Sequence, residues 1–128
     1  MGRRMILRLI DSVILIDHLN GVKKASGFLA GLDPRETAIS VITRAEILCG
    51  VDDSAFSEAG MLLDQYALLV IDRAAADAAA KLRRKNKWKL PDAFQAALAQ
   101  LHHTKLCTRN TKDFDPKKHR FVEVPYTL

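Results

Sequence analysis

The sequence lacks long hydrophobic runs and is poor in cysteine. No apolar run approaches the length that crosses a membrane, so we expect no membrane-spanning segment. The two cysteines, Cys49 and Cys107, lie in apolar runs and form no CxxC pair, which predicts buried, reduced thiols of a cytosolic protein. The basic start, residues 1–4, precedes an apolar stretch as a secretion signal does. However, Asp11 and Asp17 interrupt that stretch and no small-residue cleavage site follows. We therefore expect a cytoplasmic protein.

Clustered cysteine and histidine ligands are also missing, which argues against a zinc site. His102 and His103 are adjacent, so on a helix their rings would diverge, and surface or helix-capping positions suit them better than metal binding. His18 and His119 are isolated and receive no role. Because the 128 residues contain no repeat, low-complexity tract or linker, we predict one domain spanning residues 1–128.

Positive charge exceeds negative charge, with 20 Lys and Arg against 15 Asp and Glu. A modestly basic surface suits a polyanionic partner such as RNA, or an acidic protein. The basic residues gather in two runs, residues 83–89 and 117–120; for the first, a solvated helix face is an equally good explanation. Aromatic residues make up only 6% of the chain, so we interpret Trp88 as a packing residue rather than a platform for a base.

Short apolar runs alternate along the chain with longer segments that have helical periodicity, which predicts alternating strands and helices. The predicted strands are residues 5–10, 37–41, 68–71, 106–108 and 121–124, and the predicted helices are residues 12–19, 22–32, 43–50, 54–66, 73–85 and 91–103. Short, fully apolar strands separated by helices indicate a parallel sheet covered on both faces. We therefore predict an α/β fold with three layers (α/β/α) and a central, mostly parallel sheet of four to five strands.

Four acidic residues stand at junctions between these runs: Asp11, Glu46, Asp92 and Asp113. Ligands bind outside the carboxyl ends of the strands in such sheets, and the topology places at least three of the four acids at that edge. Converging carboxylates would repel one another unless a hard cation lay between them. The pattern therefore predicts a divalent-metal site, and all-oxygen ligands suit Mg²⁺ or Mn²⁺.

Each acid also has a purely structural explanation. Thr43 and Glu46 have the spacing of a capping box, in which Glu46 folds back onto the amide of Thr43. A cap of the following helix or turn would equally explain the other acids: Asp11, Asp92 and Asp113. We interpret Asp52 and Asp72, which also precede predicted helices, as caps alone.

Capping does not explain the sequence around each acid, which resembles the PIN-domain nucleases and specifically the VapC-type toxins of type II toxin–antitoxin pairs. Four blocks carry the resemblance in the family's order: residues 9–19, 40–50, 90–99 and 106–114, the last with the Thr-x-Asn-x-x-Asp-Phe signature. The resemblance extends from Leu9 to about Val124. Departures are few: Ser12 stands where Thr is commoner, Val13 where Asn or Ser is common, and the loop at residues 86–89 lacks a frequent glycine.

The resemblance implies a PIN-like fold and a Mg²⁺- or Mn²⁺-dependent endoribonuclease. Such a toxin cleaves cellular RNA (tRNA or another translation-related RNA), is neutralised by a cognate antitoxin, and usually forms a homodimer. The catalytic and metal-binding residues would be Asp11, Glu46, Asp92 and Asp113, with Asp115 in reserve for Asp113. Ser12, Thr108 and Asn110 would support the acids. Arg44 and Arg109, each close to a motif acid, are expected to steer phosphates.

Two alternatives remain at this point. The first is a PIN-like module that has lost catalysis and only binds RNA or a protein, although all four acids are present. The second is a receiver-type phosphoacceptor domain, which normally has paired acids after its first strand; here Ser12 follows Asp11.

Overall fold

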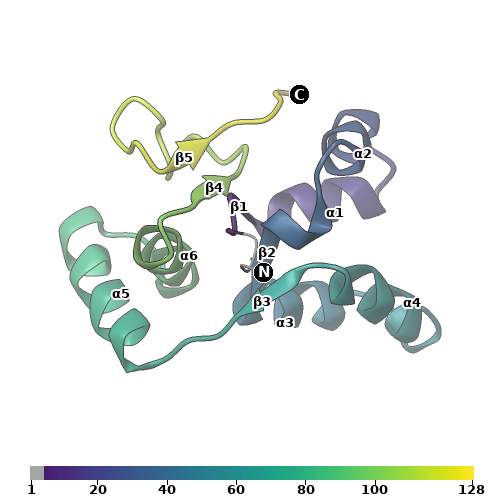
Figure 1. Cartoon of the computed structure of the whole chain (residues 1–128), viewed down its shortest axis with the longest axis horizontal. Coiled ribbons are helices and arrows are strands. Elements are labelled where there is room, and N and C mark those ends of the chain that lie inside the picture. Colours follow the sequence, from purple (N-terminus) through teal and green to yellow (C-terminus); the bar gives the residue numbers. More distant parts are fainter. Residues whose placement is uncertain (1–4) are drawn as a thin grey trace.

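Five parallel strands form the centre of the molecule, with helices on both sides (Figure 1). The computed structural model describes residues 5–128; residues 1–4, which include the basic start, lie outside the described residues. The elements are β1 (Arg8–Ile10), α1 (Ser12–Leu19), α2 (Lys23–Ala30), η1 (Pro34–Glu36), β2 (Thr37–Ser40), α3 (Val41–Cys49), α4 (Asp53–Asp64), β3 (Ala67–Leu69), α5 (Arg73–Asn86), α6 (Leu90–Leu101), β4 (Lys105–Cys107) and β5 (Val122–Glu123). The strand order is β3-β2-β1-β4-β5. The predicted α/β class and parallel sheet are confirmed.

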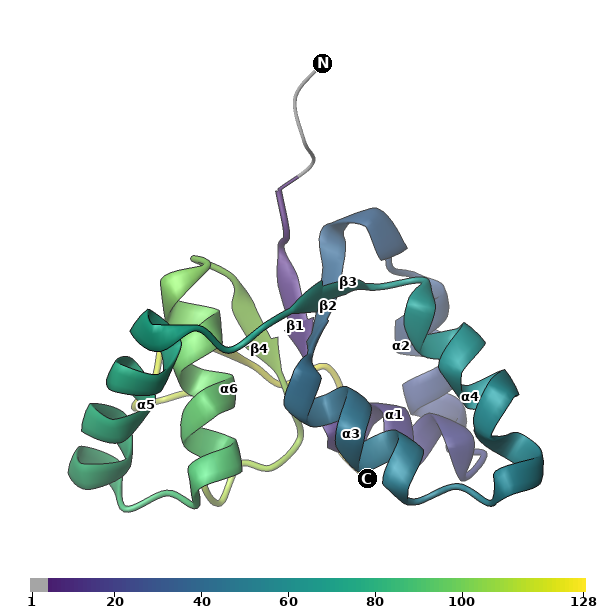
Figure 2. The ribbon, with the colours of Figure 1, turned by 90° about the horizontal axis from the view of Figure 1, so that it is seen from below.

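Alternating side chains of the strands enter two different cores. Leu9 of β1 packs with residues of α5 and α6, including Ala75 and Leu98, whereas its neighbour Ile10 packs with Ile14 of α1 and Ile47 of α3. Figure 2 shows the resulting layers, with α5 and α6 on one side of the sheet and α1 to α4 on the other. Because both faces are covered, only the ends of the strands are open to a ligand.

The helix starts differ from the prediction at one important place. Helix α3 begins at Val41, not at residue 43, because the Ser40 side chain caps it by accepting a hydrogen bond from the Thr43 amide at 3.0 Å. The capping-box interpretation of Glu46 is therefore wrong: Ser40 holds the capping position, and Glu46 lies beyond the first turn. A β-branched run that continues into the helix made this boundary hard to locate.

Of the two acids that we interpreted as helix caps alone, one makes a capping hydrogen bond and the other does not. The Asp72 carboxylate accepts from the Ala75 amide at 2.9 Å at the start of α5, as predicted. Asp52 occupies the capping position of α4 but makes no side-chain capping bond. Helix α5 ends at Asn86, and the residue that caps its end, Lys87, has a φ of 58°, in the left-handed region that glycine usually occupies.

The cysteine prediction is half right. Cys107 is fully buried, whereas Cys49, the last residue of α3, is exposed. Helix α3 presents its apolar face through Ile47, two residues earlier, so its last residue points elsewhere.

Across residues 5–128, every helix is too short or too polar to traverse a lipid bilayer.

Candidate active site

Asp11 lies directly after β1 and is held by three hydrogen bonds. Its carboxylate accepts from the Ser12 amide at 2.9 Å, from Gln95 Nε2 at 3.2 Å and from Thr108 Oγ1 at 2.7 Å. Asp11 therefore does cap α1, but donors from α6 and from the end of β4 also fix it. With only 7% of its surface exposed, it is a buried carboxylate with a single preferred orientation.

A buried polar network lies behind Asp11. Gln95 Nε2 also donates to Thr43 Oγ1 at 2.9 Å, and the Thr43 hydroxyl contacts Ser40 Oγ at 3.3 Å. Gln95 is only 2% exposed, and Ser40, Thr43 and Thr108 are completely buried. The network connects the carboxyl ends of β1, β2 and β4, so it fixes the acid relative to the sheet rather than to one helix.

The Thr-x-Asn-x-x-Asp signature forms a local chain of hydrogen bonds. The Asn110 amide donates to Thr108 Oγ1 at 3.0 Å, and Asn110 Nδ2 donates to Asp113 Oδ2 at 3.0 Å. Asp115, the reserve candidate, instead accepts from the Lys117 amide at 2.9 Å in a turn. Asp113 is thus the acid that the signature orients.

Two of the four acids, Asp92 and Glu46, have raised pKa values to which the charges of neighbouring acids contribute. Burial and, after it, the negative charges of Asp11, Asp113 and Glu46 together raise the pKa of the Asp92 carboxyl to about 6, against an opposing effect of Lys89. Burial and the charge of Asp11 likewise raise the pKa of Glu46, while a hydrogen bond from the Ser12 side chain lowers it. A carboxylate that only capped a helix would have a lowered pKa. The raised pKa values of Asp92 and Glu46 therefore reflect burial first and the neighbouring negative charges second.

Two of the acids border a cavity of about 410 Å³ at the carboxyl end of the sheet. Asp11 and Asp92 line it, whereas Glu46 lines a separate, apolar cavity and Asp113 lines a third one. Within residues 5–128, no three Asp, Glu, His or Cys side chains converge closely enough to form a complete set of metal ligands as they stand. Since like charges repel, a closer approach of these carboxylates requires a positive charge between them.

Comparison with known proteins agrees with this geometry. The family model of the PIN domain matches residues 8–118. The chain belongs to the PIN-domain family. It is 35% identical over 112 residues to ribonuclease VapC10 of Mycobacterium tuberculosis, a match that covers 83% of this chain and 84% of that protein.

Solved structures show the same relationship. A toxin–antitoxin complex from Klebsiella pneumoniae contains a chain with 37% identity and a TM-score of 0.87, with coverage of 94% of this chain and 99% of that one. FitAcB from Neisseria gonorrhoeae superposes with a TM-score of 0.80 at 21% identity and coverage of 95% and 100%, which supports the fold alone. The resemblance inferred from the four sequence blocks is confirmed, and the receiver-type alternative is wrong.

Only one of the two predicted phosphate-binding arginines lies at the central cavity of this PIN domain. Arg109 lines the cavity, whereas Arg44 forms an ion pair with Asp64 of α4 at 2.8 Å and is absent from the cavity lining. Asp17, which is 5% exposed, holds the Arg109 guanidinium through bonds to Nε at 2.5 Å and Nη2 at 2.8 Å. The Tyr126 hydroxyl also donates to Asp17 at 2.7 Å.

The ion pair between Arg109 and Asp17 stabilises the position of the Arg109 guanidinium. The hydrogen bond from Arg109 lowers the pKa of Asp17 and outweighs the opposing effect of burial, so the carboxylate stays ionised. Asp17 belongs to α1, Arg109 to the loop after β4, and Tyr126 to the segment after β5. The C-terminal segment therefore helps to fix Arg109 beside the acids.

Several residues of the PIN-domain site were absent from the sequence prediction. Gln95 and Thr43 join Asp11 to the core, and Asp17 and Tyr126 hold Arg109. Gln95 left one signal in the sequence, because it is a lone amide among the buried alanines of α6. A polar residue on the buried face of a helix needs partners, and here the partner is a candidate catalytic acid.

Proposed function

We propose that this PIN domain is a metal-dependent endoribonuclease toxin that cleaves tRNA or another translation-related RNA and is neutralised by a cognate antitoxin. The observation that carries the proposal is geometric: Asp11 and Asp92 line one cavity at the carboxyl end of the sheet, and buried hydrogen bonds from Gln95 and Thr108 fix the Asp11 carboxylate there. Support comes from the relative named a ribonuclease and from the neighbour named a toxin–antitoxin complex.

The residues present fit a hard divalent cation. The candidate ligands are carboxylate oxygens from Asp11, Glu46, Asp92 and Asp113, which suit Mg²⁺ or Mn²⁺. Their mutual repulsion is the kind of cost that a bound cation removes. When bound, the cation lowers the pKa of a water and stabilises charge on the phosphoryl oxygens.

The chain's own residues then orient the site. Thr108 and Gln95 hold Asp11, Asn110 holds Asp113, and Ser12 bonds to Glu46. Preset orientation matters because the acids need not reorganise when the substrate binds. We assign the phosphate contact to Arg109 and not to Arg44, since Arg109 lines the cavity and Asp17 fixes its direction.

The decisive experiment is a cleavage assay of the purified chain against total tRNA, ribosomal RNA and mRNA, with Mg²⁺, Mn²⁺ or EDTA. We expect discrete RNA fragments with either metal and none with EDTA, and restored cleavage when excess metal follows EDTA. RNA binding without cleavage in every metal would favour the catalytically silent module instead. Cleavage that persists in EDTA would reject the metal-dependent mechanism.

An apolar cavity offers a place for the antitoxin. It has a volume of about 490 Å³ and lies between α1, α3 and α4, with Ile16, Leu19 and Ile47 in its wall and Glu46 at its border. Ile16 and Leu19 are 43% and 45% exposed, so the cavity leaves apolar surface uncovered. A protein segment that filled it with apolar side chains and placed a basic residue at Glu46 would block the acids.

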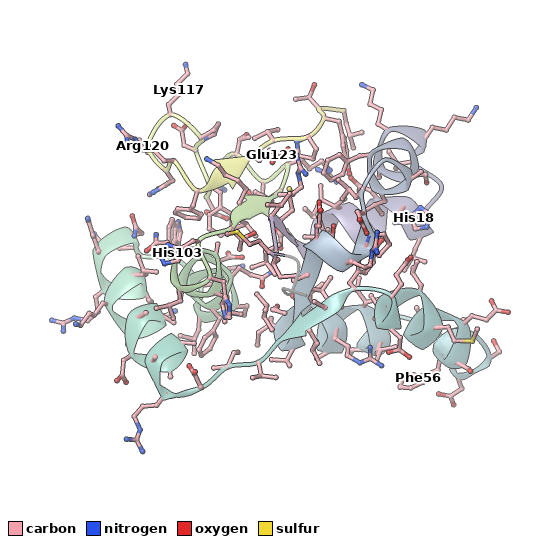
Figure 3. The ribbon with its side chains drawn as sticks, in the orientation of Figure 1. His18, Phe56, His103, Lys117, Arg120 and Glu123 are labelled. Carbon is pink, nitrogen blue, oxygen red and sulfur yellow. The ribbon has the colours of Figure 1, made fainter. Side chains whose placement is uncertain are left out.

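A second copy of the chain is the proposed partner for the exposed apolar side chains of α4, of β3 and of Val70, which follows β3. Phe56 projects from α4 away from the sheet (Figure 3), and Met61, Leu68 and Val70 are also exposed. In light scattering we expect a mass about twice the 14.3 kDa of one chain, and about half of that for a Met61→Lys/Val70→Lys variant. A wild-type protein that stays monomeric at high concentration would remove the dimer from the proposal.

A further inference from the structure

Two basic loops that are far apart in the sequence form one cavity next to Asp113. The end of α5 and the loop after it contribute Asn86, Lys87 and Trp88, and the loop between β4 and β5 contributes the rest: Thr111, Lys112, Asp113, Asp115, Lys118 and His119. The cavity has a volume of about 240 Å³. Figure 3 shows Lys117 and Arg120 of the second loop at the edge of the molecule. One lysine from each basic run of the sequence, Lys87 and Lys118, therefore lines the same cavity.

The positive charges of this cavity are available to a ligand. Lys87, Lys112 and Lys118 are exposed, and none of the three forms an ion pair with another side chain of residues 5–128. Of the two acids in the lining, Asp115 accepts from the Lys117 amide and Asp113 accepts from Asn110. Ammonium groups without a local partner attract phosphate oxygens.

One wall of the cavity is aromatic and fixed. The rings of Trp88 and His119 lie 5.1 Å apart, and His119 lies 5.5 Å from Phe121. Trp88 is only 6% exposed, and its Nε1 donates to the Asp113 carbonyl at 2.9 Å, whereas His119 keeps part of its surface exposed. His119, which received no role from the sequence, is therefore the ring on which a base could stack.

This cavity continues the central one. Thr111 and Lys112 line both, so the two cavities lie on either side of the same turn, with Asp113 between that turn and the aromatic wall. An RNA strand that places a phosphate at the acids could pass the turn and place a neighbouring nucleotide at His119.

We propose that the cavity between residues 86–88 and 111–119 is a subsite for a nucleotide adjacent to the cleaved phosphate in a single-stranded segment of RNA. Lys87, Lys112 and Lys118 bind the phosphate of that nucleotide, and its base stacks on His119. The subsite rests on the proposed ribonuclease function, and it places the strand on the Asp113 side of the acids.

The first test separates this cavity from general positive charge. We would compare Lys87→Gln/Lys118→Gln with Lys81→Gln/Lys85→Gln, which removes two exposed lysines of α5 outside the cavity lining. Binding of a fluorescein-labelled, mixed-sequence single-stranded RNA is followed by anisotropy in Ca²⁺ between about 50 and 200 mM salt. We expect roughly tenfold weaker binding for the cavity pair, with a salt slope lower by about 0.7 per lost phosphate contact. The control pair should keep most of the wild-type affinity; equal losses in both pairs would overturn the subsite.

The second test uses the fact that Trp88 is the only tryptophan. RNA that stacks on His119 should change the Trp88 emission on titration, because the two rings are 5.1 Å apart. His119→Ala should weaken RNA binding by about five- to tenfold, and His119→Phe should restore most of it, a rescue that depends on an aromatic face. Unchanged emission at saturating RNA, or an alanine variant that binds as tightly as wild type, would overturn the stacking role.

The outcomes distinguish the subsite from the function on which it rests. If wild type cleaves RNA and the cavity variants bind and cleave equally well, the subsite is wrong and the ribonuclease stands. If wild type neither binds nor cleaves RNA, both are wrong. If the lysine variants leave RNA binding intact and weaken only the association with a co-expressed antitoxin, the cavity belongs to the protein partner and the subsite is again wrong.

Discussion

Replacing Asp92 with asparagine is expected to lower metal-dependent RNA cleavage by on the order of 10²–10³-fold, because a carboxylate at the metal accounts for several kcal/mol of transition-state stabilisation. Asparagine has nearly the same shape, and Asp92 makes no helix-capping hydrogen bond that the change would remove. The same change should stabilise the metal-free protein, since Asp92 lies among the charges of Asp11, Asp113 and Glu46. Lower activity together with higher stability would mark a functional charge cluster.

The pH dependence gives this prediction its sign. The folded-state pKa of Asp92 is raised to about 6, so the folded protein holds its proton at pH values where the unfolded chain has lost it. This contribution favours folding at low pH and is lost as the pH rises through about 6. A rise of about two in pKa corresponds to roughly 3 kcal/mol, and screening at the open cavity reduces that to about 1–2 kcal/mol.

Urea unfolding of metal-free protein measures the effect. At pH 7.5 we expect Asp92→Asn to be about 1–2 kcal/mol more stable than wild type, and at pH 4 the difference should vanish. Asp77→Asn, which changes an exposed acid of α5, is the matched control and should alter neither cleavage nor stability appreciably. A folded Asp92→Asn protein with full cleavage would refute the assignment of this acid.

The order of elements was predictable because it depends on local patterns. Each predicted strand is a short segment rich in apolar residues, and each predicted helix shows an apolar face, so the parallel sheet and its open carboxyl edge followed from the sequence. Boundaries were less accurate where a pattern was ambiguous. β-branched residues occur both in β2 and in the first turn of α3, so their pattern does not show where the strand ends. The hydrogen bond from the Thr43 amide to the Ser40 side chain sets the start of the helix.

The missed contacts of the site join residues that are distant in the sequence. Gln95 and Asp11 are separated by 84 positions, and Arg109 and Asp17 by 92. Sequence periodicity does not reveal such pairs, because it reports the local helix or strand of each residue and not the contacts that form between distant residues on folding. The four acids could be proposed from the sequence because each belongs to a local motif, whereas their partners do not.

Replacing Phe114 with alanine is the change with the largest expected effect on stability. Phe114 directly follows Asp113, is completely buried, and packs against Trp88 at 5.1 Å and Phe121 at 6.4 Å between ring centroids. Loss of a buried phenylalanine side chain costs about 3–5 kcal/mol, a large part of the stability of a domain of this size. Phe114→Leu, which keeps much of the volume, should cost less, about 1–2 kcal/mol.

The effect should reach the active site, because the same packing carries Asp113. Trp88 touches Phe114 and donates to the Asp113 carbonyl, so a cavity beside Trp88 loosens the segment that holds the acid. Urea unfolding and Trp88 emission measure the two consequences separately. Leu101→Ala, a truncation at a position 44% exposed, is the control and should stay within about 0.5 kcal/mol of wild type. If Phe114→Ala were as stable as this control, the aromatic packing would not be what fixes Asp113 beside the other acids.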